Sequence, residues 1–239
     1  MGELVLIVPC FNESERLDVA AFTAFTRDNP SVRLLFVDDG SADGTAARCA
    51  GLGEVLRLPS NVGKGEAVRA GVRRALAQGA AEVGWWDADL ATPLDELAAL
   101  RMALVGDVAF VLGSRVKLLG RAIARSPARH DLGRVAATWV SLALGLPVYD
   151  TQCGAKLMRA DLAAELFEPA FLIAWMFEVE LLARLRHRRP GWTAADVERV
   201  VHEVPLRRWT EIPGSRLRWR DVLAVPWQLW RIRRAWPRS

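Results

Sequence analysis

Two acidic residues, Asp87 and Asp89, stand directly after the apolar run at residues 83–86. Because side chains alternate between the two faces of a strand, these carboxylates would point the same way if the strand continued through them. Like charges repel, and a buried ionised carboxylate is costly unless a cation or a metal ion compensates it. The pair therefore predicts either a solvated loop or a site that holds positive charge.

Three more polar clusters follow predicted strands, at residues 9–13, 38–41 and 113–115. In open α/β sheets, ligands bind beyond the carboxyl ends of the strands. A single Asp-Asp-Gly-Ser sequence is typical of a turn, but four polar clusters on one edge indicate a binding site. No G-x-G-x-x-G follows the first strand, and residues 63–65 lack the frame of a P-loop, which argues against a dehydrogenase or a P-loop NTPase.

Strands and helices that could present these clusters alternate along the first half of the chain. Strands are expected at residues 4–8, 32–37, 55–58, 83–86 and 108–112. Helices are expected at residues 15–27, from Thr45, over a segment with small or apolar residues at 68, 71, 72, 75 and 76, and after Thr92. In the last helix, Thr92 suits the N-cap and Pro93 the first helical position. This order predicts an α/β fold with a mostly parallel sheet and helices on both faces.

The composition fits one large domain or two small ones in a reducing compartment. Of the 239 residues, 51% are hydrophobic, which is enough for a substantial core. The three cysteines form no C-x-x-C pair, and their odd number argues against a disulfide framework. We expect no secretion signal at the N-terminus. No apolar run reaches the roughly 18 residues of a membrane-spanning helix, and the stretch at residues 135–148 suits a buried or interfacial helix.

Positive charge collects toward the C-terminus. Residues 207–239 contain nine arginines against Glu211 and Asp221, and five of the ten tryptophans. The whole chain carries +4 and this segment carries +7, so residues 1–206 carry about −3. A solvated basic helix is one interpretation, but indole rings favour the lipid headgroup layer and arginine attracts anionic lipid. Nucleic acid is the rival partner, and no helix-turn-helix, zinc-finger or RNP pattern supports it.

Several motifs, in chain order, resemble those of family 2 glycosyltransferases of the GT-A fold. The segments VPCFNESERL, VDDGSADGT and NVGKGEAVRAG resemble the first motifs of that family. A narrower branch, the dolichyl-phosphate β-glucosyltransferases, is resembled by DADLATP, GSR, DTQCGAKLM, WMFEVELLARL and VPLRRWTEIPGSRL. The match runs from about residue 4 to residue 217. Ala155 and Glu178 depart from it, since the branch has Phe and Asp at these positions.

The resemblance gives Asp87 and Asp89 a role in binding a nucleoside diphosphate sugar. It implies that Asp89 is a direct ligand of a divalent cation, and that Asp87 contacts the ribose or holds the metal through water. A hard cation between carboxylate and phosphate oxygens neutralises the leaving diphosphate. Related mannosyl enzymes have Gln where Ala91 stands, so the choice between Mg²⁺ and Mn²⁺ stays open.

Other donor-binding residues follow from the same resemblance. Asp39 either binds the ribose or caps its turn, Lys64 lies near the phosphates or in solvent, and Gln152 contacts sugar hydroxyls. The residues expected to bind the nucleotide sugar are Pro9, Asn12, Glu13, Asp38, Asp39, Lys64, Asp87, Ala88, Asp89 and Gln152.

The acceptor that the resemblance implies is a polyprenyl phosphate. A phosphate monoester has a second pKa of about 6 and is already anionic near pH 7, so it needs positioning more than deprotonation. Asp150 and Arg115 are the predicted catalytic residues. Asp150 is an acidic residue near the sugar or else a strand-to-loop cap, and Arg115 offers a planar fork for phosphate oxygens. Arg125 and Arg129 are expected to bind the acceptor phosphate, with a surface charge as the alternative for each.

These patterns predict an inverting glycosyltransferase that moves a hexose, with glucose as the expected sugar, from a UDP-sugar to a polyprenyl phosphate. We expect a GT-A domain at residues 1–212 and a basic, Trp-rich, membrane-interfacial tail at residues 213–239. The protein would be cytoplasmic and bound peripherally to an anionic membrane surface. Two alternatives stay open, namely the same fold with a soluble glycan or other hydroxyl acceptor, and a non-catalytic membrane-associated relative.

Overall fold

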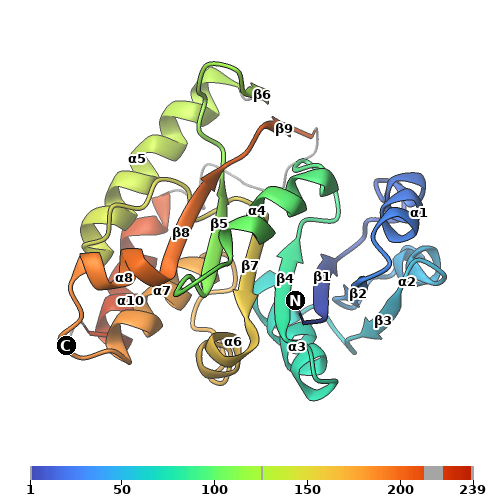
Figure 1. The fold of residues 1–239 in the computed structure, drawn as a ribbon, viewed down its shortest axis with the longest axis horizontal. Coiled ribbons are helices and arrows are strands. Elements are labelled where there is room, and N and C mark those ends of the chain that lie inside the picture. The colour runs from blue at the N-terminus through green and yellow to red at the C-terminus, as the bar shows by residue number, and fades with distance from the viewer. Residues whose placement is uncertain (1, 125, 213–222, 238–239) are drawn as a thin grey trace.

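Seven strands form the central sheet of the computed structural model, which describes residues 2–124, 126–212 and 223–237 (Figure 1). In chain order the strands are β1 (Leu4–Cys10), β2 (Val32–Asp38), β3 (Glu54–Arg57), β4 (Glu82–Trp86), β5 (Phe110–Ser114), β7 (Ala155–Arg159) and β8 (Val201–Pro205). They lie in the order β3-β2-β1-β4-β7-β5-β8. Neighbouring strands are parallel except for β7, which runs antiparallel to both β4 and β5.

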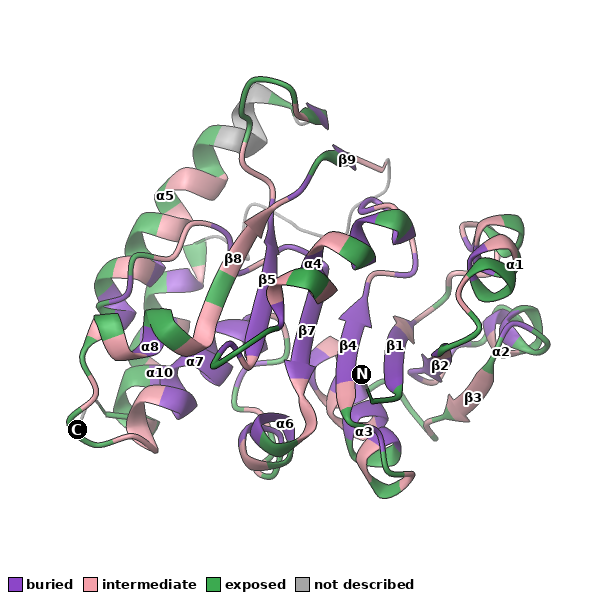
Figure 2. Ribbon diagram, viewed as in Figure 1, coloured by how far each residue is buried: buried purple, intermediate pink, exposed green. Residues whose placement is uncertain are grey.

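Two adjacent tryptophans show how the sheet separates two apolar layers. Trp85 and Trp86 are both fully buried, and because neighbouring strand residues face opposite sides, each belongs to a different layer. The helices packed on the Trp86 side are α1 (Val19–Asp28), α2 (Thr45–Cys49) and α4 (Leu97–Ala103). The helices packed on the Trp85 side are α3 (Lys64–Ala77), α5 (Pro127–Leu144), α6 (Ala160–Leu166), α7 (Phe177–His187), α8 (Ala194–Val200) and α10 (Val225–Ala235). Figure 2 shows the buried strands between helices whose outer faces are exposed.

The strand register brings several loops to one edge of the sheet. Cys10 of β1 lies opposite Asp38 of β2, and Ile7 lies opposite Trp85 of β4, so these three strands end close together. The antiparallel strand β7 begins where β4 ends, with Ala155 opposite Trp86. Its preceding loop therefore joins the same edge as the loops that follow β1, β2, β4 and β5.

The predicted α/β order is confirmed, with shifts at element ends. The first helix begins at Val19 rather than at residue 15, and β5 extends to Ser114. The prediction that Thr92 caps a helix is wrong. A 3₁₀ turn, η1 (Leu94–Glu96), follows Pro93 instead. Thr92 is buried, its hydroxyl lies 3.9 Å from the sulfur of Cys153, and its carbonyl accepts the indole N–H of Trp86.

The C-terminal part of the fold adds a short parallel pair, β6 (Ala122–Ala124) with β9 (Arg208–Thr210), and helix α10. Val225, Leu229 and Ile232 of α10 are buried in the layer that contains α5 and α7. Pro226 lies in the first turn of α10, where its missing N–H is tolerated. The predicted division of the tail at this proline concerns residues 213–222, which lie outside the described residues. No helix in the described parts of the chain is long and apolar enough to cross a membrane.

Candidate active site

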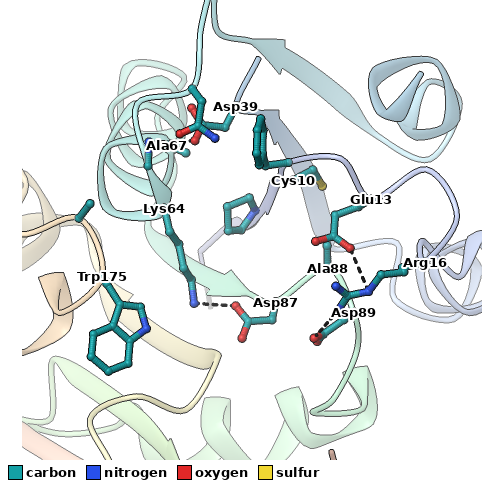
Figure 3. Close-up of a pocket in the computed structure, with 15 residues that line it drawn as sticks. Cys10, Glu13, Arg16, Asp39, Lys64, Ala67, Asp87, Ala88, Asp89 and Trp175 are labelled. Atoms are coloured by element: carbon teal, nitrogen blue, oxygen red, sulfur yellow. Dashed lines mark hydrogen bonds and ion pairs between the residues drawn. The ribbon is translucent and has the colours of Figure 1, made fainter. Parts of the chain in front are cut away.

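A cavity of about 370 Å³ opens at the carboxyl edge of the sheet, over the ends of β1, β2 and β4 (Figure 3). Its walls come from these strand ends, from the start of α3 and from the loop before α7. The lining residues are Pro9, Cys10, Phe11, Glu13, Arg16, Asp39, Asn61, Gly63, Lys64, Ala67, Asp87, Ala88, Asp89, Ala174 and Trp175. The cavity thus lies where α/β sheets bind their ligands.

Hydrogen bonds fix the loop after β1 against the loop after β2. The backbone N–H of Asn12 donates to Ser41 Oγ at 2.9 Å, and that of Glu13 donates to Thr45 Oγ1 at 2.8 Å. In return, the N–H of Ala42 donates to Asn12 Oδ1. Asn12 has a φ of 50°, a left-handed conformation that Asn adopts more easily than most residues. These bonds hold one wall of the cavity in place.

Asp39 holds the loop that leads into α3. Its two carboxylate oxygens accept the N–H groups of Val62 and Gly63 at 2.8 and 2.9 Å. Gly63 has a φ of 90°, and a Cβ on Gly65 would lie only 3.0 Å from the side chain of Phe177. The glycines thus let the start of α3 approach α7 closely, which places Lys64 at the rim of the cavity.

Each of the two strand-end carboxylates faces a basic side chain from another element (Figure 3). Lys64 Nζ lies 2.7 Å from Asp87 Oδ1. Arg16 Nη2 donates to Asp89 Oδ2 at 3.1 Å, and Arg16 Nε lies 3.4 Å from Glu13 Oε2. The sequence pattern left a solvated loop or a positively charged site as alternatives, and the geometry shows carboxylates that are compensated by cations.

The two carboxylates differ in their pKa. Burial raises the pKa of Asp87, but the charges of Lys64, Lys156 and Arg115 together outweigh burial and hold this pKa below its usual value. Burial and the Asp87 charge together raise the pKa of Asp89. Burial by itself would lower the pKa of Lys64. The charges of Asp87 and then Glu178 raise this pKa above its usual value. Asp87 and Lys64 therefore form a fixed ion pair.

A turn, and not a continuing strand, positions Asp87 and Asp89. Strand β4 ends at Trp86, and the N–H of Asp87 donates to the carbonyl of Gly154. Leu90 has a φ of 51°, and its N–H donates back to the carbonyl of Asp87. A Cβ on Gly154 would lie 2.0 Å from Asp87 Oδ2, so only glycine fits there. The loop before β7 therefore shapes the carboxylate turn.

Arg115 and Asp150 form a two-pronged ion pair beside this turn. Arg115 Nε donates to Asp150 Oδ2 at 2.6 Å, and Nη2 donates to Oδ1 at 2.7 Å. The backbone N–H groups of Arg115 and Gln152 donate to the same two oxygens. A carboxylate has about four acceptor positions, and these four bonds occupy them. Burial by itself would raise the pKa of Asp150. The charge and hydrogen bonds of Arg115 have the opposite effect, and the pKa of Asp150 lies below its usual value.

Residues of strands β8 and β9 contact the Arg115–Asp150 pair. Glu203 of β8 accepts the N–H groups of Tyr149 and Asp150 at 2.8 and 2.6 Å. The guanidinium of Arg115 lies 5.3 Å from the ring centre of Trp209 on β9. Arg115 also lowers the pKa of Asp87 through its charge, after the contributions of Lys64 and Lys156. The pair thus lies within electrostatic reach of the cavity.

The oxygen atoms of Asp87 and Asp89 fit a hard divalent cation. Such ions are often held by one or two carboxylates together with substrate phosphates and water. In the described part of the chain, no group of three or more His, Cys, Asp or Glu side chains could hold a metal by itself. Phosphate oxygens or water would therefore complete the coordination of an ion at Asp89.

The structure brings together part of the predicted site. Seven predicted residues line the cavity: Pro9, Glu13, Asp39, Lys64, Asp87, Ala88 and Asp89. The predicted residues Asn12, Asp38 and Gln152, and the pair of Arg115 and Asp150, lie outside this lining. Asp38 is fully buried and accepts the N–H of Ser41. Arg125 lies outside the described residues, and Arg129 falls on α5, where its side chain is not described.

Sequence reasoning missed several lining residues that lie inside the quoted motifs. Arg16 belongs to the first motif, Asn61 and Gly63 to the loop before α3, and Trp175 to the motif at the start of α7. Arg16 stands three residues after Glu13. Nothing in this spacing shows that its partner is Asp89, which lies 73 positions away.

Comparison with protein families places most of the chain in one group. The model of glycosyl transferase family 2 matches residues 5–167. A dolichyl-phosphate beta-glucosyltransferase of Drosophila melanogaster is 34% identical over an alignment of 238 positions, which covers 90% of this chain and 69% of the relative. A dolichyl-phosphate beta-glucosyltransferase of Trichomonas vaginalis is 32% identical over an alignment of 232 positions, which covers 89% of this chain and 65% of the relative. The chain spans about two thirds of the length of these relatives.

Solved structures share the fold at lower identity. The glucosyl-3-phosphoglycerate synthase of M. tuberculosis has a TM-score of 0.68 and 19% identity, with 97% of this chain and 79% of that chain covered. Another structure of that synthase, in complex with Mn²⁺, UDP-glucose and phosphoglyceric acid, has a TM-score of 0.67 and 19% identity, with 97% and 78% covered. These similarities confirm the GT-A class of α/β fold.

Proposed function

The chain belongs to glycosyltransferase family 2, and on this premise we propose that it transfers glucose from UDP-glucose to a polyprenyl phosphate of the dolichyl type. The cavity at the ends of β1, β2 and β4, with Asp87 and Asp89 in its wall, is the observation that carries the proposal. Relatives at 32 and 34% identity bear the name dolichyl-phosphate beta-glucosyltransferase. A synthase of similar fold was solved with Mn²⁺ and UDP-glucose, which supports the choice of donor.

In this proposal the donor lies along the cavity with its diphosphate at the carboxylate turn. Pro9, Glu13 and Asp39 lie on the side suited to base and ribose. A Mg²⁺ or Mn²⁺ ion held by Asp89 would supply positive charge to the leaving diphosphate. Lys64 is kept protonated by Asp87 and adds a second positive charge at the same place.

The acceptor phosphate would attack the anomeric carbon from the Arg115 side, with inversion. Its oxygen is already ionised near pH 7, so the site has to orient it and exclude water rather than remove a proton. Asp150 suits an orienting role rather than that of a base, because its acceptor positions are taken by Arg115 and Gln152. We assign Asp150 the role of fixing the plane of the Arg115 fork. The remaining N–H groups of that guanidinium would bind phosphate oxygens.

Two arginines of the segment before and within α5 remain candidates for the acceptor phosphate. Arg125 and Arg129 flank the start of α5, which follows β6 at the top of the molecule in Figure 1. This part of the proposal rests on the resemblance and on their place in the chain.

The acceptor also calls for contact with a membrane, and helices α5 and α10 offer an apolar surface for it. Leu132, Val135, Trp139 and Leu142 recur at intervals of three and four along α5, and all are exposed. On α10, which packs against α5, Trp227 and Trp230 are 57 and 55% exposed. Arg231 lies 4.8 Å from the ring centre of Trp227, and Arg234 lies 5.4 Å from that of Trp230. Such a surface suits the headgroup layer of an anionic membrane at its cytoplasmic face.

A transfer assay tests the function. Purified protein is incubated with UDP-glucose, other UDP- and GDP-sugars, Mg²⁺ or Mn²⁺, and a short polyprenyl phosphate, and lipid products are identified by mass spectrometry. We expect a monoglucosyl polyprenyl phosphate from UDP-glucose. Transfer to a soluble glycan with no lipid product would replace the proposed acceptor, and no transfer from any sugar would contradict the enzyme assignment.

Vesicle co-sedimentation tests the membrane contact. Core residues such as Ile232 belong to α10, and its removal would uncover the apolar residues of α5 and α7 beneath it, so point substitutions are the cleaner test. We expect the double variant Trp227→Ser, Trp230→Ser to bind anionic vesicles more weakly, with a salt-dependent part left to the arginines. Met102→Ser on α4 is the matched control, because Met102 is also an exposed apolar residue but lies on the other side of the sheet. Equal loss in both variants would contradict a role specific to α10.

A further inference from the structure

Arg16 lies in the wall of the cavity between Glu13 and Asp89 (Figure 3). Its Nη2 donates to Asp89 Oδ2 at 3.1 Å, and its Nε lies 3.4 Å from Glu13 Oε2. The side chain is 28% exposed, so it is neither a core residue nor a free surface charge. Arg16 thus links the loop after β1 to the turn after β4 with a charged contact inside the candidate donor site.

This contact places a guanidinium on the carboxylate that best suits a metal ion. Asp89 Oδ1 accepts the N–H of Ala91, and Oδ2 accepts Arg16. A divalent cation at Asp89 would meet the positive charge of Arg16 on the same carboxylate. Two cations at such a short separation repel each other strongly in a partly buried site. Binding of the ion therefore favours a weaker contact between Arg16 and Asp89.

The donor gives the displaced guanidinium a new partner. A diphosphate brings several anionic oxygens to the carboxylate turn, and the planar fork of Arg matches phosphate geometry. Arg16 is already positioned at this wall by its contact with Glu13. Lys64 differs, because it starts α3 and pairs with Asp87.

We propose that Arg16 is a displaceable counter-ion of Asp89, which competes with the divalent cation in the free protein and binds the donor's diphosphate once the cation is in place. The two roles have opposite effects on affinity. Arg16 weakens the binding of the metal alone and strengthens the binding of the metal–nucleotide complex. The inference rests on the proposed donor but not on the lipid acceptor or on the transfer of sugar.

Two binding measurements on the full chain test this inference without any turnover. In the first, Mn²⁺ alone is titrated and free Mn²⁺ is followed by electron paramagnetic resonance. In the second, UDP is titrated in saturating Mn²⁺ by calorimetry. For Arg16→Ala we expect Mn²⁺ to bind about three- to tenfold tighter, since a like charge has been removed, and UDP to bind at least about threefold more weakly, since a phosphate contact is lost.

Two further variants keep the test specific. Arg16→Lys retains the charge, so Mn²⁺ affinity should stay near that of the wild type while UDP affinity falls in part. Arg57→Ala is the matched control, because Arg57 also pairs with a strand-end aspartate, Asp38, but does not line the cavity. It should change neither affinity.

The outcomes separate this inference from the proposed function. Mn²⁺ affinity that is unchanged or lower in Arg16→Ala overturns the competition at Asp89. UDP affinity that rises together with Mn²⁺ affinity overturns the contact to the diphosphate. A wild-type protein that binds Mn²⁺ and UDP but transfers no glucose would contradict the proposed function and leave both titrations valid as tests of Arg16.

Discussion

Hydrogen bonds and ion pairs connect the loops that follow β1, β2 and β4, whereas another part of the surface exposes apolar side chains. We call the first the carboxylate region, which comprises residues 4–103, and the second the apolar region, which comprises the loop at 116–121 with α5 and α10. Among the residues that the structure describes, nine of the fourteen exposed large apolar side chains lie in or next to the apolar region: Leu118, Leu119, Leu132, Val135, Trp139, Leu142, Leu223, Trp227 and Trp230. The clustering is too marked for scattered surface residues.

The difference corresponds to the two substrates of the proposed reaction. A soluble, highly charged donor is bound best by charges and N–H groups that are already in position, because they need no reorganisation when charge develops. The carboxylate region has such fixed contacts, as at Asp39 and Asp87. An acceptor with a long apolar chain stays in the membrane, so its side of the enzyme has to be apolar on the outside.

The largest expected effect lies in the carboxylate region. Asp89→Asn removes the charge that would hold the divalent cation, and we expect transfer to fall at least about a thousandfold, which corresponds to roughly 4 kcal/mol. UDP binding, measured by calorimetry with and without Mn²⁺, should lose its metal dependence. Asp28→Asn, at a surface pair with Arg27, is the control. Metal-dependent UDP binding of normal strength in Asp89→Asn would contradict the assignment of the charged donor and its cation to the carboxylate region.

A buried ion pair anchors the apolar region to the rest of the fold. Arg184 of α7 is fully buried and donates to Glu180 Oε1 at 2.7 Å and to the carbonyls of Leu166 and Ala170. The indole N–H of Trp236, at the end of α10, donates to the same oxygen of Glu180 at 3.1 Å. The pair thus connects α7, the loop before it and the C-terminal helix.

Arg184→Met should lower the free energy of unfolding by about 3 kcal/mol, because it leaves Glu180 as an uncompensated buried charge. Urea unfolding followed by circular dichroism measures this change. Arg189→Met is the control, since its pair with Glu165 is partly exposed and should contribute less than about 1 kcal/mol. A similar loss of unfolding free energy in both variants would mean that the buried Arg184–Glu180 pair stabilises the fold no more than a partly exposed pair does.

The Arg115–Asp150 pair lies between the two regions and should make stability depend on pH. Asp150→Asn should lower the free energy of unfolding at pH 7 by about 2 kcal/mol, through lost hydrogen bonds to a charged group. Because the pKa of Asp150 is lowered in the folded protein, its contribution is present above the unfolded pKa of about 3.9 and is lost as the pH falls through the folded pKa. The difference between wild type and variant should therefore shrink below pH 4. A difference that stays constant with pH would show that Asp150 is not held as a carboxylate.

Arg115→Lys should have a smaller effect that is mainly kinetic. An ammonium keeps the charge opposite Asp150 but cannot reproduce the two-pronged contact. We expect kcat/KM to fall about tenfold or more, which is roughly 1.4 kcal/mol, while UDP affinity stays near that of the wild type. Unchanged kcat/KM would place the acceptor phosphate elsewhere.

The smallest effect on stability is expected in the apolar region itself. Leu142 is 71% exposed on α5, so Leu142→Ser should change the free energy of unfolding by less than about 0.5 kcal/mol. Binding to anionic vesicles should nevertheless fall about twofold to fivefold, because the side chain would be buried in the headgroup layer. A variant that loses stability but keeps its vesicle binding would show that this face packs within the protein.

The sequence alone determined five of the seven strands of the sheet and the class of site. Alternating apolar runs and polar clusters predicted β1, β2, β3, β4 and β5, because buried parallel strands are continuous apolar segments and their carboxyl ends must carry the ligand groups. Asp87 and Asp89 were recognised from the charge placed at the end of such a run. The sequence did not predict η1 after Pro93, since the preference of Thr for N-caps is outweighed by the burial of Thr92 against Cys153.

Tertiary structure decided the partners of the charged residues, because they come from positions that are distant in the chain. Arg16 pairs with Asp89 across 73 positions, and Arg115 pairs with Asp150 across 35. Strand β7 decides the second pairing, since its antiparallel insertion brings residues 150–154 to the edge where β4 ends. Residue types and local spacing fix which groups can carry charge, but the direction of a strand and the packing of a loop fix which opposite charge each of them meets.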